Sequence, residues 1–150
     1  DLVGHARPDT PVMLDYATQV KGDSMYNTPP CWCIYILGMV LQWLEELGGL
    51  SEMEKINAEK AALLYDYLDE SKLFHGAARP EGRSRMNVTF RTADKDLDAL
   101  FAKEAAAAGL SNLKGHRLVG GMRASIYNAM PMEGVIALRD FMARFEKEHI

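Results

Sequence analysis

The chain has 150 residues, of which 48% are hydrophobic and 25% charged, and its formal net charge is −4. That length suits one domain, or one domain with part of another, and the composition is ordinary for a globular protein. The acidic balance argues against a general nucleic-acid binder. Cys31 and Cys33 are separated by a single residue, which suits neither a disulfide nor a complete metal site. We therefore expect reduced thiols, no bound metal and a cytoplasmic location.

The first third of the chain predicts short elements followed by one long apolar helix. Val12 to Tyr16 predicts a short strand, and residues 21–24 predict a turn. Pro29-Pro30 suit the entry to a helix that runs to Leu47, where two glycines end it. Because this helix is apolar on nearly every side, we expect it to be buried. Its apolar run is too short to span a bilayer, so we expect no membrane partner.

The remaining residues predict a mixture of helices and strands. We predict helices over 51–69, over 94–108 and from Pro131 onward, and strands over 85–91 and 122–127. A capping box formed by Ser51 and Glu54 marks the start of the first of these helices. Few strands and several helices predict an α+β fold, in which helices cover one face of a small, mostly antiparallel sheet.

Cationic side chains gather in the segment from 111 to 128. Lys114, His116, Arg117 and Arg123 lie close together there, and no Asp or Glu occurs between residues 105 and 132. Guanidinium groups match carboxylate and phosphate oxygens, so the segment is a candidate pocket for a small anion. The alternative is an exposed basic hairpin paired with acids from other segments. The alternating pattern predicts that Arg123 and the His116-Arg117 pair lie on neighbouring strands around a Gly-Gly turn.

Three segments resemble one enzyme family. Residues 114–131, KGHRLVGGMRASIYNAMP, resemble the C-terminal signature of the phosphoserine aminotransferases. Residues 25–30, MYNTPP, resemble the family's segment leading into its interdomain helix, and residues 83–88, RSRMNV, resemble its first small-domain strand. These segments occur in the family's order, and the resemblance extends over essentially the whole chain.

The resemblance implies a homodimeric, pyridoxal 5'-phosphate-dependent aminotransferase of fold type I. Such enzymes move an amino group between L-glutamate and 3-phosphohydroxypyruvate, giving 2-oxoglutarate and O-phospho-L-serine for serine biosynthesis. In many bacteria they also serve pyridoxine biosynthesis. The resemblance further implies that residues 1–48 hold the tail of a large cofactor domain and a long interdomain helix, and that 49–150 form the small C-terminal domain.

The resemblance also implies roles for individual residues. Arg123 would bind the substrate α-carboxylate, while His116 and Arg117 would help bind the substrate phosphate. Asn27 and Thr28 would reach the cofactor phosphate of the partner subunit across the dimer interface. Each role has an alternative: a surface ion pair for the arginine, a turn cap for the histidine, and a helix-entry sequence for the Asn-Thr pair.

The family's Schiff-base lysine has no counterpart in a matching sequence context. The lysines stand at positions 21, 55, 60, 72, 95, 103, 114 and 147, and apart from Lys114 they read as helix-surface or turn residues. We therefore expect the C-terminal part of such an enzyme, without a catalytic residue of its own and inactive alone. We also expect its apolar helix, deprived of the large domain, to expose surface or associate. The alternatives are a non-catalytic regulatory module that binds an anionic amino acid, and a neighbouring fold-type-I enzyme for another amino acid.

Overall fold

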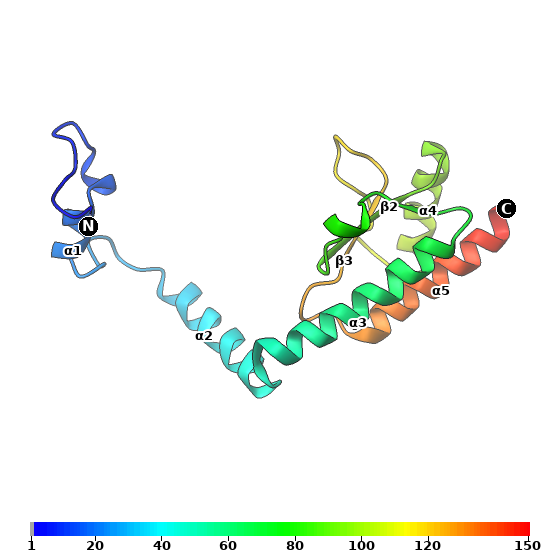
Figure 1. Cartoon of the computed structure of the whole chain (residues 1–150), viewed down its shortest axis with the longest axis horizontal. Coiled ribbons are helices and arrows are strands. Elements are labelled where there is room, and N and C mark those ends of the chain that lie inside the picture. Colours follow the sequence, from blue (N-terminus) through cyan, green and yellow to red (C-terminus); the bar gives the residue numbers. More distant parts are fainter. Residues whose placement is uncertain (1) are drawn as a thin grey trace. The chain divides into compact units, whose positions relative to one another are not determined.

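The computed structural model describes residues 2–150. The chain divides into two compact units, residues 1–45 and 46–150. Among the described residues, five α-helices, two short 3-10 helices and one three-stranded antiparallel sheet form the regular structure (Figure 1). The predicted α+β fold is confirmed. The assignment of residues 1–48 to the tail of a cofactor domain stays a prediction.

The first unit begins with short helical elements. A 3-10 helix covers Val12–Leu14 and α1 covers Tyr16–Lys21. The predicted strand from Val12 to Tyr16 is therefore wrong. A local contact favours helix over strand here, because the Asp15 side chain accepts a hydrogen bond from the Ala17 N–H at 3.0 Å and caps α1. A short apolar run beside such a cap does not distinguish a strand from a helical turn.

Helix α2, Cys31–Glu46, confirms the predicted long helix, but the prediction that it is buried is wrong. None of its residues is buried in this chain, and Trp32 is 72% exposed. The helix therefore exposes apolar surface, as expected for the chain on its own, and association through that surface stays a prediction.

Among residues 2–150, no single helix is both long and apolar enough to cross a membrane. Helix α2 meets that test only when joined, across a break, to the helix that follows it.

The second unit is built from three helices and the sheet. Helix α3 covers Gly49–Glu70, α4 covers Lys95–Ala107 and α5 covers Met132–His149. Strands β1 (His75–Gly76), β2 (Asn87–Arg91) and β3 (Met122–Ser125) pair antiparallel in that order, and a 3-10 helix, Pro80–Gly82, precedes β2. Because α3 begins at Gly49, with Gly48 at φ 107° as its N-cap, Ser51 lies inside the first turn and the predicted capping box is wrong.

Helices α3, α4 and α5 share one hydrophobic core with one face of the sheet. Figure 1 shows α3 and α5 lying side by side along that layer. Phe101 of α4 is fully buried and its ring lies 5.1 Å from the rings of both Phe74 and Phe145. The strands contribute alternate residues to this core: Val88, Phe90, Met122 and Ala124. Their intervening residues therefore lie on the opposite, outer face of the sheet.

A half-buried carboxylate joins α5 to the end of α3. Glu146 accepts hydrogen bonds from the Tyr67 hydroxyl, from Ser71 Oγ at 2.8 Å, and from the backbone N–H groups of Lys72 and Leu73 at 2.7 and 3.2 Å. Burial alone raises the pKa of Glu146, but these hydrogen bonds outweigh it, so the pKa falls below the ordinary value of 4.5. The ionised carboxylate is thus part of the folded structure.

Candidate functional site

The cationic segment forms a closed hairpin loop beside β3. The Gly115 N–H donates to the Gly121 carbonyl at 2.9 Å, and the Arg123 N–H donates to the Leu113 carbonyl at 2.8 Å. Inside the loop that these bonds close, the His116 carbonyl accepts hydrogen bonds from the N–H groups of Val119 and Gly120, at 2.9 and 2.8 Å. His116 and Arg117 therefore lie in the loop. The prediction that they occupy a strand next to Arg123 is wrong, because pairing ends at Gly115.

Two glycines are required for the loop to close. A Cβ added at Gly115 would lie 2.3 Å from the Gly120 carbonyl oxygen, closer than van der Waals contact allows. Gly121 has φ +65°, and its added Cβ would lie 2.8 Å from the Phe90 carbonyl oxygen. The two sides of the loop thus approach each other closely at its base, where the loop joins the end of the sheet.

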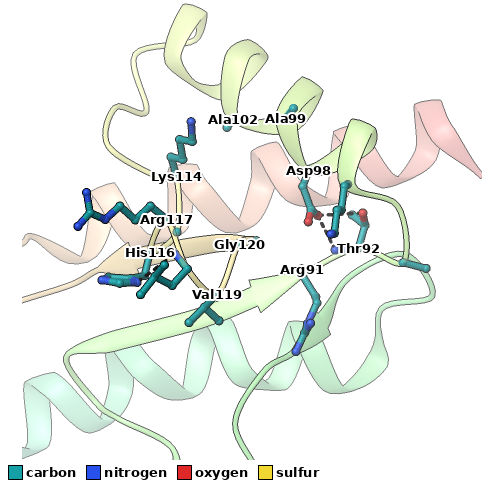
Figure 2. Close-up of a pocket in the computed structure, with 15 residues that line it drawn as sticks. Arg91, Thr92, Asp98, Ala99, Ala102, Lys114, His116, Arg117, Val119 and Gly120 are labelled. Carbon is teal, nitrogen blue, oxygen red and sulfur yellow. Dashed lines mark hydrogen bonds between the residues drawn. The ribbon is translucent and has the colours of Figure 1, made fainter.

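Two hollows flank this loop. The α4 hollow, about 500 Å³, is bordered by α4 and by Lys114, His116 and Arg117. Figure 2 shows it, with Lys114 directed toward α4 and Arg91 extending to the other side of β2 from Asp98. The sheet-face hollow, about 200 Å³, is bordered by His116, Arg91 and Arg123. The structure therefore brings Arg123 and His116 to one hollow and places Arg117 on the other, while His116 borders both.

The cations of these hollows have no acidic partner among residues 2–150. The ion pairs of the second unit involve other cations, such as Arg83 with Asp69 and Arg85 with Glu54. The acid that borders the α4 hollow, Asp98, accepts hydrogen bonds from Thr92 N and Thr92 Oγ1 at 2.7 and 2.9 Å. The alternative of a basic hairpin paired with acids elsewhere is not what the described residues form. The site offers unneutralised positive charge to a ligand.

A buried lysine at the other end of β3 from this loop was not predicted from the sequence. Lys60 of α3 is 0% exposed, so the prediction of a surface lysine is wrong at this position. Its Nζ lies 2.9 Å from the Tyr127 carbonyl oxygen and 3.1 Å from that of Met130, with the Ile126 and Asn128 carbonyls at 3.4 Å. Burial lowers the pKa of Lys60. The ammonium group thus fixes the turn that leads from β3 to α5.

A signal for this arrangement exists in the sequence. Asn57 and Lys60 lie on the same stripe of α3 as the apolar Met53 and Leu64, which are buried. The Asn57 amide also donates to Asn128 Oδ1 at 2.8 Å, so both polar residues of the stripe bind the same turn. Polar residues at core positions of an amphipathic helix indicate buried hydrogen-bonding partners.

Asn27 and Thr28 lie in the first unit, in the extended stretch before α2, and both are exposed. The Asn27 Nδ2 lies 3.4 Å from Met13 Sδ, and the side chains of the pair keep an amide and a hydroxyl donor at the surface. Such donors fit a phosphate group. Their predicted contact with the cofactor stays a prediction.

Comparison with known families agrees with this description. Residues 3–138 match the model of the class-V aminotransferases, and the chain therefore belongs to that family.

Within it, the chain is similar to phosphoserine aminotransferases. It is 58% identical over 138 residues to that of Limosilactobacillus fermentum, covering 92% of this chain and 39% of the relative. It is 53% identical over 149 residues to that of Histophilus somni, covering 99% and 42%.

Solved structures give the same relationship. The phosphoserine aminotransferase of Bacillus circulans subsp. alkalophilus has a TM-score of 0.92 at 46% identity, covering 100% of this chain and 42% of that one. The pyridoxal phosphate-bound enzyme of Trichomonas vaginalis has a TM-score of 0.83 at 44% identity, covering 92% and 40%. The resemblance predicted from the motifs is confirmed, and the chain spans about two fifths of the length of these relatives.

Proposed function

We propose that this chain forms the substrate-binding part of a pyridoxal phosphate-dependent phosphoserine aminotransferase. The reaction transfers an amino group between L-glutamate and 3-phosphohydroxypyruvate, giving 2-oxoglutarate and O-phospho-L-serine. The observation that supports it best is the sheet-face hollow, where Arg123 and His116 meet without an acidic partner among residues 2–150. Both amino donors are anionic acids, so cations without acidic neighbours offset the cost of removing them from water.

The proposed roles follow the chemistry of each side chain. Arg123, on the outer face of β3, offers a planar pair of N–H donors to the substrate α-carboxylate. His116 and Arg117 offer donors to the substrate phosphate. Because Arg117 borders the α4 hollow and Arg123 borders the sheet-face hollow, the loop and β3 together present cations on two sides. The two sides together would orient a substrate that carries charge at both ends.

The cofactor is part of the proposal. When bound, pyridoxal phosphate supplies the electron sink that amino transfer requires. Asn27 and Thr28 would hold its phosphate group through their exposed amide and hydroxyl donors, in a homodimer where they serve the partner subunit. The lysine that binds the cofactor would come from outside these 150 residues. Lys60, the most deeply buried lysine among the described residues, already donates to backbone carbonyls.

A chimera tests this proposal. The matching region of the Limosilactobacillus fermentum phosphoserine aminotransferase would be replaced by this chain, and amino transfer to 2-oxoglutarate would be measured from O-phospho-L-serine and from L-serine. We expect a preference for the phosphorylated donor of about 100-fold or more, because a site built for phosphate leaves its cations unpaired when that group is missing. Arg123→Gln should abolish transfer from both donors, whereas Arg144→Gln on α5 should change neither.

The chain alone, supplied with pyridoxal phosphate and both substrates, should show no amino transfer. Equal use of the two donors by the chimera would exclude the phosphate roles of His116 and Arg117 and favour an enzyme for another amino acid. A chimera that is inactive although folded and loaded with cofactor, combined with tight phosphoserine binding by the chain itself, would favour the regulatory module instead.

A further inference from the structure

We propose that Arg91 is a further substrate-binding residue of this site and contacts the phosphate end of the ligand beside His116. The inference rests on the proposed function. Arg91 is the last residue of β2 and is exposed. It borders both the α4 hollow and the sheet-face hollow, and no acidic side chain forms an ion pair with it among residues 2–150.

The strand register places Arg91 next to Arg123. Thr89 lies opposite Arg123 in the pairing of β2 with β3, and Arg91 follows Thr89 by two residues, on the same face. Diagonal neighbours of an antiparallel pair are about 7–8 Å apart, a span that long side chains reach across. The two guanidinium groups therefore approach the same small hollow from adjacent strands.

The residue facing Arg91 across the ladder keeps this hollow open. That residue is Gly121, whose added Cβ would lie 3.1 Å from the Arg91 Cβ. With no side chain at this position, the space between Arg91 and His116 remains as the sheet-face hollow of about 200 Å³. This volume is below the range of about 300–1,000 Å³ that is typical of sites for drug-sized ligands, and it suits a small anionic ligand such as a phosphorylated amino acid.

The charges around Arg91 favour an anion with more than one negative charge. On β1 the residue paired with Arg91 is His75, which brings no negative charge. On β3, at the other side of Arg91, Arg123 also has no acidic partner among residues 2–150. Like charges on one face of a sheet repel, and a bound anion relieves that repulsion. A phosphate group carries more charge than a carboxylate and can accept from two cations at once, so we assign it to Arg91 and His116.

The test is a titration of the full 150-residue chain, labelled with ¹⁵N, with O-phospho-L-serine, L-serine and inorganic phosphate, followed by amide chemical shifts. Arg91→Gln should weaken binding of phosphoserine and of phosphate by about three- to tenfold and leave L-serine unchanged, as expected for one charge-assisted contact near the surface. Arg91→Lys should restore part of the loss, because it keeps the charge without the fork. Arg144→Gln makes the same charge change on α5, away from both hollows, and should have no effect.

The outcomes separate this inference from the proposed function. If phosphoserine binds more tightly than serine, and Arg123→Gln weakens it while Arg91→Gln behaves like Arg144→Gln, the role of Arg91 is overturned and the proposed function stands. If wild-type chain shows equal shifts with phosphoserine and serine, or none with either, the phosphate preference fails and the role of Arg91 fails with it. Preserved spectra for the rest of the second unit show that each variant is folded.

Discussion

Replacing Lys60 by methionine tests whether its buried ammonium group stabilises the fold. Two of its carbonyl contacts, at 2.9 and 3.1 Å, have ordinary hydrogen-bond lengths, and two at 3.4 Å are weaker. With each shorter contact to a charged donor contributing about 1.5 kcal/mol, their loss costs about 3 kcal/mol. Methionine fills a similar volume and carries no charge, so the substitution removes the cost of burying an ammonium group. This offsets the loss by on the order of 1 kcal/mol. We expect Lys60→Met to lower the free energy of unfolding by about 2 kcal/mol.

Urea unfolding followed by circular dichroism measures this difference. For a unit of this size the midpoint should fall by about 1 M urea, with little change in slope. Lys55→Met is the matched control. Lys55 lies on the same helix, is exposed and pairs with Glu52 at 3.0 Å, so its replacement should cost less than about 0.5 kcal/mol. If both variants unfold at the wild-type midpoint, the carbonyl contacts of Lys60 do not stabilise the fold and the reasoning is refuted.

Three further predictions concern the core, a half-buried carboxylate and the loop. Phe101→Ala should cost about 3–5 kcal/mol of unfolding free energy in a denaturant titration, and Leu100→Ala, which is 36% exposed, about 1 kcal/mol or less; equal losses would contradict the packing. Burial raises the pKa of Glu146, but its hydrogen bonds outweigh burial, so the pKa in the folded protein lies below the ordinary value. The ionised Glu146 therefore stabilises the folded protein fully above about pH 4.5, and this stabilisation is lost as the pH falls through the lowered pKa. Glu146→Gln should therefore flatten the acid side of the profile of stability against pH, and an unchanged profile would count against this. Gly115→Ala should weaken phosphoserine binding in the same NMR titration, because its Cβ would lie 2.3 Å from a carbonyl oxygen of the loop, whereas Gly76→Ala meets nothing within 4 Å and should bind normally.

Elements whose burial follows local periodicity were predictable from the sequence. The alternation of residues 122–127 correctly separates buried Met122 and Ala124 from exposed Arg123. The apolar stripe of α5 is buried as its helical spacing predicts. In both cases one neighbouring layer covers one face of the element. The strand repeat of two residues or the helix repeat of 3.6 residues is therefore enough to predict which side chains are buried.

The predictions that were wrong depend on contacts that a local pattern does not contain. The four carbonyls that receive Lys60 lie 66 to 70 residues further along the chain, a separation that no local pattern encodes. The burial predicted for α2 depended on a partner surface, and within this chain its residues stay exposed or half-buried. The candidate site shows the same division. Its cations were found by composition, but the placement of Arg117 and Arg123 on different hollows depends on the positive φ angles of Gly120 and Gly121.

The two faces of the sheet separate folding from recognition. Along β2 and β3 the residues alternate, so each inward residue that packs on the helices is followed by an outward one that does not. Thr89, Arg91 and Arg123 can therefore change without opening a cavity in the core, and the charge at these positions can be adapted to a ligand at little cost in stability. Gly121 has no such freedom, because its backbone touches β2 while its missing side chain keeps the hollow open. We infer that ligand preference at this site is set by the outward strand residues together with the side chains of His116 and Arg117 in the loop, while the loop glycines determine whether the site forms at all.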